Sequence, residues 1–256
     1  MKSFRICMQN IRKWGSNSRI KMCLIMSFLF VYSYISGMWK IIPLVGEKMN
    51  PWIFPFLFCW RFMKIVFMAP IVFIFCDAPF IDSNQSYVML RTSRKKWCFG
   101  QVLYIYAGSV IYAFVLFFST IIINIGHIKW GTSWGKVLGS AGTSTVLAHW
   151  ELIMVLSFIF IGLLIYTVNV ITKTNVAGTI IAGFFVILTA VVDGNQRLIW
   201  FSPISWNSLN NIDVAGMTAN PSIGYVLGMY VLLIAVLTFL AVFFGRKQEI
   251  IVRNEH

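Results

Sequence analysis

The sequence predicts an all-α, polytopic membrane protein with six transmembrane helices and an N-terminal amphipathic helix. Of its 256 residues, 59% are hydrophobic and 11% are charged, whereas a soluble domain carries about 25% charged residues. The apolar residues gather in six runs of roughly the length that crosses a bilayer. Too few polar residues remain to cover a soluble domain, so we expect residues 1–256 to form a single transmembrane domain.

Residues 1–19 predict an amphipathic helix that lies in the membrane interface. Its apolar stripe at helical spacing consists of Phe4, Cys7, Met8, Ile11 and Trp14. Basic residues lie off this stripe, and Gly15 is a natural stop. The alternative is a disordered basic tail. The first apolar run lacks a small-residue cleavage site, so we expect the segment to be retained.

Six apolar runs follow this helix. The predicted spans cover residues 22–39, 52–76, 102–125, 147–170, 176–192 and 223–244. The second run is interrupted by prolines and by two basic residues, and the fifth is the shortest. The connection at 171–175 is so short that the fourth and fifth helices must form an antiparallel hairpin.

The net charge of +13 reflects orientation in a membrane rather than nucleic-acid binding, because the basic residues flank apolar runs. With the N-terminus inside, inner segments hold fourteen Lys and Arg and outer segments hold five. Basic residues near short loops are retained in the cytoplasm. We therefore expect a multi-pass protein of the cell membrane, in contact with the lipid bilayer, with both termini cytoplasmic.

Two polar segments stand out between the runs. Residues 77–101 form the longest polar interruption, with a predicted short helix at 83–92, and lie on the cytoplasmic side. Such a loop suits contact with a soluble partner. On the outer side, residues 198–209 are too short and broken to span. They form either a re-entrant piece or an ordinary loop anchored by tryptophans.

No catalytic constellation is present in the sequence. The three histidines lie far apart, no Cys/His spacing suits a metal, and the five cysteines show no pairing. The stretch GTSWGK at 131–136 is one residue short of a phosphate-binding loop, and Val137 replaces the hydroxyl that the loop needs. We expect no enzyme activity, no metal and no cofactor on this chain.

Arg61 and Lys64 share one face of the second predicted helix. Burying a charge in a span costs about 2.5 to 3.5 kcal/mol. We therefore expect either that both residues line a cavity near Glu151, or that the span starts later and both lie near the outer interface. Small residues four apart, which let helices approach closely, are candidates for packing within the chain or between two copies. They are Gly178, Ala182, Gly224 and Gly228.

Together these features resemble ABC-2 type transporter permeases. The residues that carry the resemblance are DAPF at 77–80, Tyr87, RTSRKKW at 91–97, Gly100 with Gln101, and FSPISW at 201–206. The resemblance covers essentially the whole chain and is strongest to small Gram-positive permeases. It implies an exporter of two permease subunits, identical or paralogous, and two ATPase subunits that hold ATP and Mg²⁺. It also implies a peptide or amphipathic substrate.

In this resemblance the 77–97 segment docks on the ATPase. The residues implied in that contact are Asp77, Pro79, Phe80, Tyr87, Arg91, Arg94, Lys95 and Trp97. Phe80 and Tyr87 would supply apolar anchors. The basic residues would pair either with acids of the ATPase or with lipid headgroups.

Other functions are weighed against the exporter. A secondary transporter or channel would call for an internal repeat with paired broken helices, and no convincing repeat is visible. A membrane-embedded enzyme would call for polar residues clustered at one depth. A non-transporting immunity or sensor protein on the same fold is also compatible with the sequence. An ATPase that co-purifies separates the exporter and the immunity protein from the others, and vesicle transport separates those two.

Overall fold

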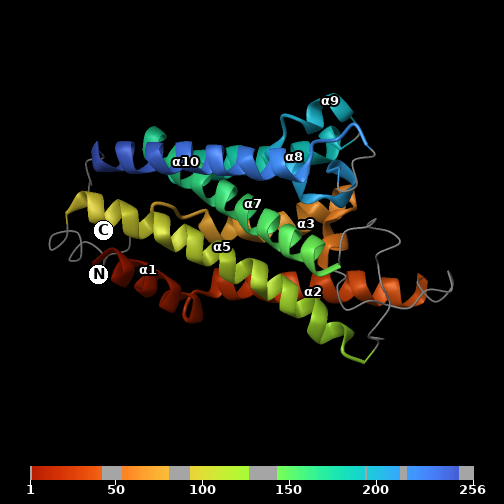
Figure 1. Ribbon diagram of the computed structural model, residues 1–256. Coiled ribbons are helices and arrows are strands. Elements are labelled where there is room, and N and C mark those ends of the chain that lie inside the picture. The colour runs from red at the N-terminus through yellow and green to blue at the C-terminus, as the bar shows by residue number, and fades with distance from the viewer. Residues whose placement is uncertain are drawn as a thin grey trace.

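The computed structural model describes residues 2–41, 54–80, 93–126, 143–193, 195–213 and 218–247. Within these ranges the regular secondary structure is helical, apart from one isolated bridge between Asp213 and Ser222. The long helices run lengthwise through an elongated bundle (Figure 1). The all-helical class is therefore as the sequence predicts.

Four helices are long and apolar enough to cross a membrane, judged by length and composition. They are α2 (Ser18–Ile41), α5 (Arg94–Asn124), α7 (Thr143–Thr172) and α10 (Ile223–Lys247). α2 and α7 extend their predicted spans at both ends, and α10 begins at the predicted residue 223 but ends at 247 instead of 244. α5 begins eight residues before the predicted boundary at 102 and ends one residue before the predicted 125. These helices mark a membrane-embedded protein.

Two further apolar helices are shorter. α3 (Arg61–Phe75) has 15 residues and α8 (Ala177–Val192) has 16. At about 1.5 Å per residue they reach roughly 23 Å, against about 30 Å for the hydrocarbon core. The expected run 52–76 is broken at Trp60, whose extended backbone separates α3 from the short helix η3 (Phe54–Phe58). Six complete spans therefore stay a prediction.

α7 forms the centre of the bundle, and α3, α5, α8 and α10 pack around it. In the most apolar 18-residue stretch of α7, 78% of the window is buried inside the bundle, against 22% in the corresponding stretches of α2 and α10. α7 and α8 pack against each other as the short connection predicts. A Cβ added to Gly178 would lie only 2.3 Å from the carbonyl oxygen of Ile165, so this close crossing requires glycine.

The N-terminal helix α1 (Lys2–Arg12) packs along the first turns of α5 rather than standing alone. Three side-chain hydrogen bonds join α5 to α1 and to the short helix η1 (Lys13–Gly15), which follows α1. They run from Ser3 Oγ to the Lys96 carbonyl at 2.8 Å, from Asn10 Nδ2 to Gln101 Oε1 at 2.8 Å and from Trp14 Nε1 to Tyr104 Oη at 2.9 Å.

The buried face of α1 differs from the predicted apolar stripe. Ile6, Cys7 and Asn10 are buried, whereas Phe4 and Met8 are exposed. The reason is that polar Asn10 finds a partner on α5, which turns part of the apolar stripe outward. The structure has a helix at Lys2–Arg12, and an amphipathic helix that lies in the membrane interface stays a prediction.

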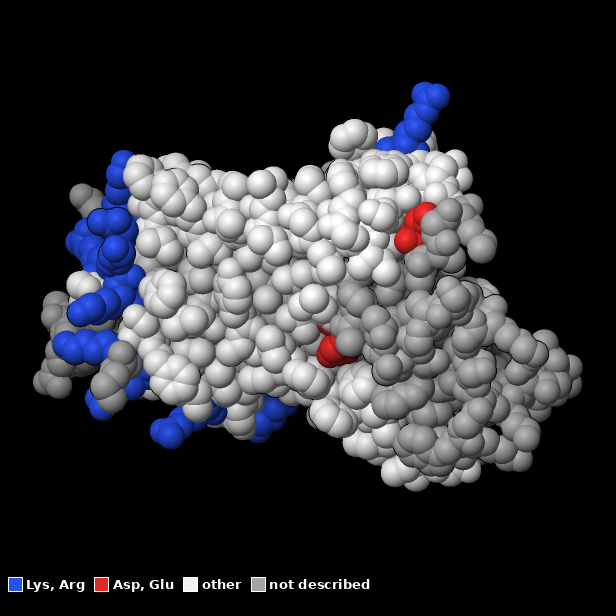
Figure 2. All heavy atoms as spheres, viewed as in Figure 1, with Lys and Arg blue, Asp and Glu red and all other residues white. Residues whose placement is uncertain are grey.

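Basic side chains gather at one end of the bundle, over α1, the start of α5 and the end of α10 (Figure 2). The exposed basic residues of these elements include Lys2, Arg5, Arg94, Lys95, Lys96, Arg246 and Lys247. The middle of the visible face carries almost no charge (Figure 2). This is the distribution expected of a protein whose apolar middle section lies in a bilayer.

Candidate functional site

Two polar clusters lie at the two ends of the bundle. The first surrounds Cys76–Phe80, a turn that follows α3 and that we call the junction. Its backbone folds back through hydrogen bonds from Ala78 N to the Phe75 carbonyl at 3.0 Å and from Phe80 N to the Asp77 carbonyl at 2.9 Å. Asp77 forms an ion pair with Arg19 of α2, with 2.8 Å between Arg19 Nη2 and Asp77 Oδ2. The junction is thereby tied to α2.

Asn169 of α7 holds the junction from the other side. Its amide nitrogen donates to the carbonyl of Ala78 at 2.8 Å, and its amide oxygen accepts from the backbone nitrogen of Gly178 at 2.7 Å. Thr179 of α8 donates to the carbonyl of Cys76 at 3.3 Å. One asparagine thus joins the junction to both helices of the hairpin.

Phe80 closes the junction by packing inside the bundle. Its ring centroid lies 4.8 Å from that of Tyr104, edge-on, and 6.2 Å and 6.4 Å from those of Phe75 and Tyr166. Its φ of 58° is left-handed, which costs a non-glycine residue about 1 kcal/mol or more. Phe80 is thus buried by its own chain, and its expected role as an anchor for an ATPase stays a prediction.

The other residues of the expected docking segment are divided between surface and interior. Arg94 and Lys95 are exposed in the first turn of α5, and Pro79 follows a cis peptide bond inside the junction. Trp97 is buried with Ile6 and Cys98, so it packs α1 on α5 and is not on a free surface.

Part of the segment lies outside the described residues. This applies to Tyr87, to Arg91 and to the predicted short helix at 83–92.

A small hollow opens at the elbow between α1 and α2, next to the junction. Its volume is about 50 Å³. The lining residues are Asn10, Lys13, Asn17, Ile20, Asp77, Phe80 and Tyr104. Polar and charged side chains from three separate segments therefore meet around one cavity at the basic end of the bundle.

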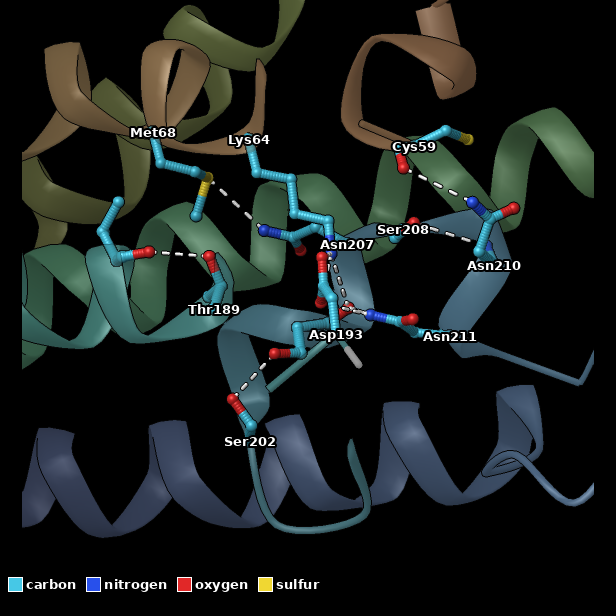
Figure 3. A network of polar contacts seen from close by, with 12 residues as sticks. Cys59, Lys64, Met68, Thr189, Asp193, Ser202, Asn207, Ser208, Asn210 and Asn211 are labelled. Atoms are coloured by element: carbon cyan, nitrogen blue, oxygen red, sulfur yellow. Dashed lines mark hydrogen bonds and ion pairs between the residues drawn. The ribbon is translucent and has the colours of Figure 1, made fainter. Parts of the chain in front are cut away.

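The second cluster is centred on Lys64 of α3 (Figure 3). Lys64 Nζ donates to both carboxylate oxygens of Asp193, at 2.8 and 2.6 Å, and their side chains are 1% and 6% exposed. Asn211 Nδ2 donates to Asp193 Oδ1 at 2.7 Å and to the Ser205 carbonyl at 2.8 Å. The ion pair is therefore both buried and saturated with hydrogen bonds, which is what a buried charge requires.

The charged pair in the second run was expected to line a cavity near Glu151. Lys64 is fully buried and its carboxylate partner is Asp193 rather than Glu151, while the cavity itself stays a prediction. Both carboxylate oxygens of Glu151 are buried and have no hydrogen-bond partner among the described residues. The side chain of Arg61 lies outside the part of the chain that the structure describes.

Sequence reasoning missed Asp193, although a signal exists. A lysine inside an apolar run calls for a counter-charge, and Asp193 is the acidic residue that ends the fifth apolar run. The separation of 129 residues hides the pairing in the sequence.

Residues 195–211 form a cap over this second cluster. The cap contains α9 (Gln196–Ile199), η4 (Pro203–Asn207) and η5 (Leu209–Asn211). Trp206 is fully buried and donates to the Ile199 carbonyl at 2.7 Å, while Tyr230 of α10 donates to the Pro203 carbonyl at 2.5 Å. The segment expected to be re-entrant or a plain loop is thus a folded cap tied to α3, α8 and α10.

The small-residue pairs fall into two classes. Gly178 and Ala182 are buried within the chain, at the contact of α8 with its neighbours. An added Cβ at Gly224 or Gly228 would meet no described atom within 4 Å. The first pair therefore serves packing within the chain, and the second lies on an open face of α10.

No protein-family model matches this chain, and no curated protein matches it.

Proposed function

We propose that this chain is the permease subunit of an ABC-2 type exporter, with six spans in the cell membrane and both termini cytoplasmic. A separate ATPase subunit, in two copies, would hydrolyse ATP, and a second permease subunit would complete the pathway. The cargo would be a peptide or another amphipathic molecule. The observation that carries the proposal is the junction Cys76–Phe80, which leads directly into the segment that the resemblance assigns to the ATPase.

The junction is suited to passing force from that segment to the helices. Asp77 is paired with α2, the carbonyls of Cys76 and Ala78 accept hydrogen bonds from α8 and α7, and Phe80 packs on α5. A displacement of the residues that follow Phe80 would therefore act on four helices together. Packed helices respond to such a displacement as rigid bodies, because protein interiors are close-packed.

The charge distribution supports the orientation in this proposal. Basic side chains gather at the end of the bundle that carries the junction, and basic residues near short loops are retained in the cytoplasm. The junction would then face the ATPase side, and the cap at 195–211 would cover the outer ends of α3 and α8. Together with this cap, the two short helices would span the thickness of the membrane.

The open face of α10 supports assembly with a second permease subunit. Gly224 and Gly228 leave room beside α10, and small residues at this spacing let the backbones of two helices approach closely in a membrane. A homodimer or a pair of paralogues would use this face.

The proposal is tested by capturing the full chain from membranes in mild detergent and identifying a co-purifying ATPase by mass spectrometry. We expect Arg94→Glu with Lys95→Glu to lower the amount of captured ATPase at least several-fold. The matched control, Arg246→Glu with Lys247→Glu, reverses two charges at the same end of the bundle and should leave capture unchanged.

An equal loss of captured ATPase in the two double variants would show that these charges serve lipid contact and not docking. Absence of any captured ATPase from the wild-type chain would overturn the proposal. ATP-dependent peptide uptake into inverted vesicles would then separate an exporter from a non-transporting protein of the same build.

A further inference from the structure

We propose that Glu151 of α7 is a proton-binding site, whose side chain is a neutral carboxylic acid in the folded protein at neutral pH. Both of its carboxyl oxygens are buried, and neither has a hydrogen-bond partner among the described residues. An ionised carboxylate that is buried without donors is costly, and such a group takes up a proton instead. The inference rests on the surroundings of Glu151 and is independent of the proposed export function.

The elements that pack against α7 bring no counter-charge to Glu151 in the described part of the chain. These elements are α3, α5, α8, α10, η3 and η4. α8, η3 and η4 contain no charged residue, and the charged residues of α5 and α10 lie at the basic end of the bundle. On α3, Lys64 is held by Asp193. The side chains of Arg61 and His149 lie outside the described part of the chain.

The hydroxyl groups of the neighbouring helices donate elsewhere. Tyr225 and Tyr230 of α10 donate to carbonyls of the cap at 3.2 and 2.5 Å. Tyr112 of α5 donates to a carbonyl of α3 at 2.9 Å. Ser119 of α5 and Ser157 of α7 donate to carbonyls of their own helices, at 2.6 and 2.8 Å. Each of these donors is thus engaged, and none of them stabilises an ionised Glu151.

The burial of both oxygens also selects the proton among cations. A metal ion such as Ca²⁺ needs several oxygen ligands, and the described residues include no group of three His, Cys, Asp or Glu that could hold one. A proton needs neither further ligands nor a cavity. Glu151 precedes Asn169, which holds the junction, by roughly five turns or 27 Å of α7. The residue as a whole is half-buried, so its proton exchanges at the end of the bundle that carries the cap.

The test uses the full chain purified in dodecyl maltoside and measures the C=O stretching band of a carboxylic acid, which an ionised carboxylate lacks. Infrared spectra of the wild-type chain and of Glu151→Gln are compared at neutral pH. We expect a carboxylic acid band in the wild-type chain that is missing from Glu151→Gln. The matched control Asp213→Asn also removes an acidic group, at a half-buried position that follows the cap, and it should keep the band.

A bound proton also makes stability depend on pH. In the unfolded chain an exposed glutamate loses its proton near its ordinary pKa of about 4.3, whereas the folded chain keeps it. The folded state then binds one proton more, so stability falls as the pH rises. Thermal unfolding of the wild-type chain and of Glu151→Gln is therefore compared between about pH 5 and about pH 7. The folding equilibrium constant of the wild-type chain should fall, relative to that of the variant, by up to about tenfold per pH unit.

Three results would overturn the inference. One is the absence of any carboxylic acid band from the wild-type chain at neutral pH, a result that needs no variant. Another is a difference between the wild-type and Glu151→Gln midpoints that stays constant as the pH rises, which would show that a basic group such as Arg61 balances an ionised Glu151. The last is saturable stabilisation by sodium, potassium or calcium ions that Glu151→Gln abolishes, which would assign the carboxylate to a metal ion.

Discussion

Replacing Asp193 with asparagine should destabilise the protein strongly. The substitution keeps the size of the side chain but removes the carboxylate that holds the buried ammonium of Lys64 at 2.8 and 2.6 Å. Removing one partner of a buried ion pair costs about 3–5 kcal/mol. At roughly 2–4 °C per kcal/mol for a chain near this length, the midpoint of thermal unfolding should fall by about 6–20 °C.

A second substitution makes this prediction specific to the ion pair. Lys64→Met removes the buried cation with little change in volume, and replacing both charges of a buried pair is often close to neutral. The double variant, Lys64→Met with Asp193→Asn, should therefore unfold at a higher temperature than Asp193→Asn alone. Thermal unfolding of the purified chains in one detergent measures both, and Arg197→Gln, which removes an exposed charge of the cap, is the control.

The reasoning is refuted if Asp193→Asn unfolds within about 2 °C of the wild-type chain, a shift worth roughly 1 kcal/mol or less. It is also refuted if the losses of the two single variants simply add in the double variant, because two residues in direct contact should show a coupling energy. Either result would mean that Lys64 stays solvated in the membrane protein.

Gly178→Ala should destabilise the protein by about 1–3 kcal/mol or more, because the added Cβ would lie 2.3 Å from a backbone oxygen. The control Gly228→Ala should be neutral or stabilising by up to about 1 kcal/mol, because the added Cβ meets no described atom within 4 Å. Equal midpoints of thermal unfolding in the two variants would contradict this. Phe80→Ala should lower the free energy of unfolding by about 3 kcal/mol and reduce the yield of folded protein. Retention of full stability would place the ring outside the core. In a chain without native cysteines, Lys173→Cys should react with an impermeant thiol reagent only from the cytoplasmic side and Arg197→Cys only from outside. The opposite pattern would invert the proposed topology.

The fold was predictable where local pattern decides the structure. Apolar runs of adequate length became α5, α7 and α10, because a helix is the way for one segment to satisfy its own backbone in lipid. The short connection before α8 likewise dictated the hairpin. The break at Trp60 was not predictable, since no residue there forbids a helix and the extended backbone depends on packing against other segments.

The candidate sites were predictable only in part. The stretch around Asp77 stood out as a polar interruption, yet its polarity concealed that Phe80 turns inward to meet Tyr104 and Tyr166. The need of Lys64 for a counter-charge was visible, but its partner was not, because nothing local relates residues so far apart in the sequence. The exposed part of α1 was misjudged for the same reason: Asn10 is buried through a partner on α5.

The position of the Lys64–Asp193 pair also constrains how the protein is made. Lys64 leaves the ribosome 129 residues before Asp193, which at roughly 5–20 residues per second is about 6 to 26 s. During that interval Lys64 lacks the carboxylate of Asp193, and placing a charge inside the bilayer is costly. We therefore expect α3 to reach its final position only after the α7–α8 hairpin has entered the membrane.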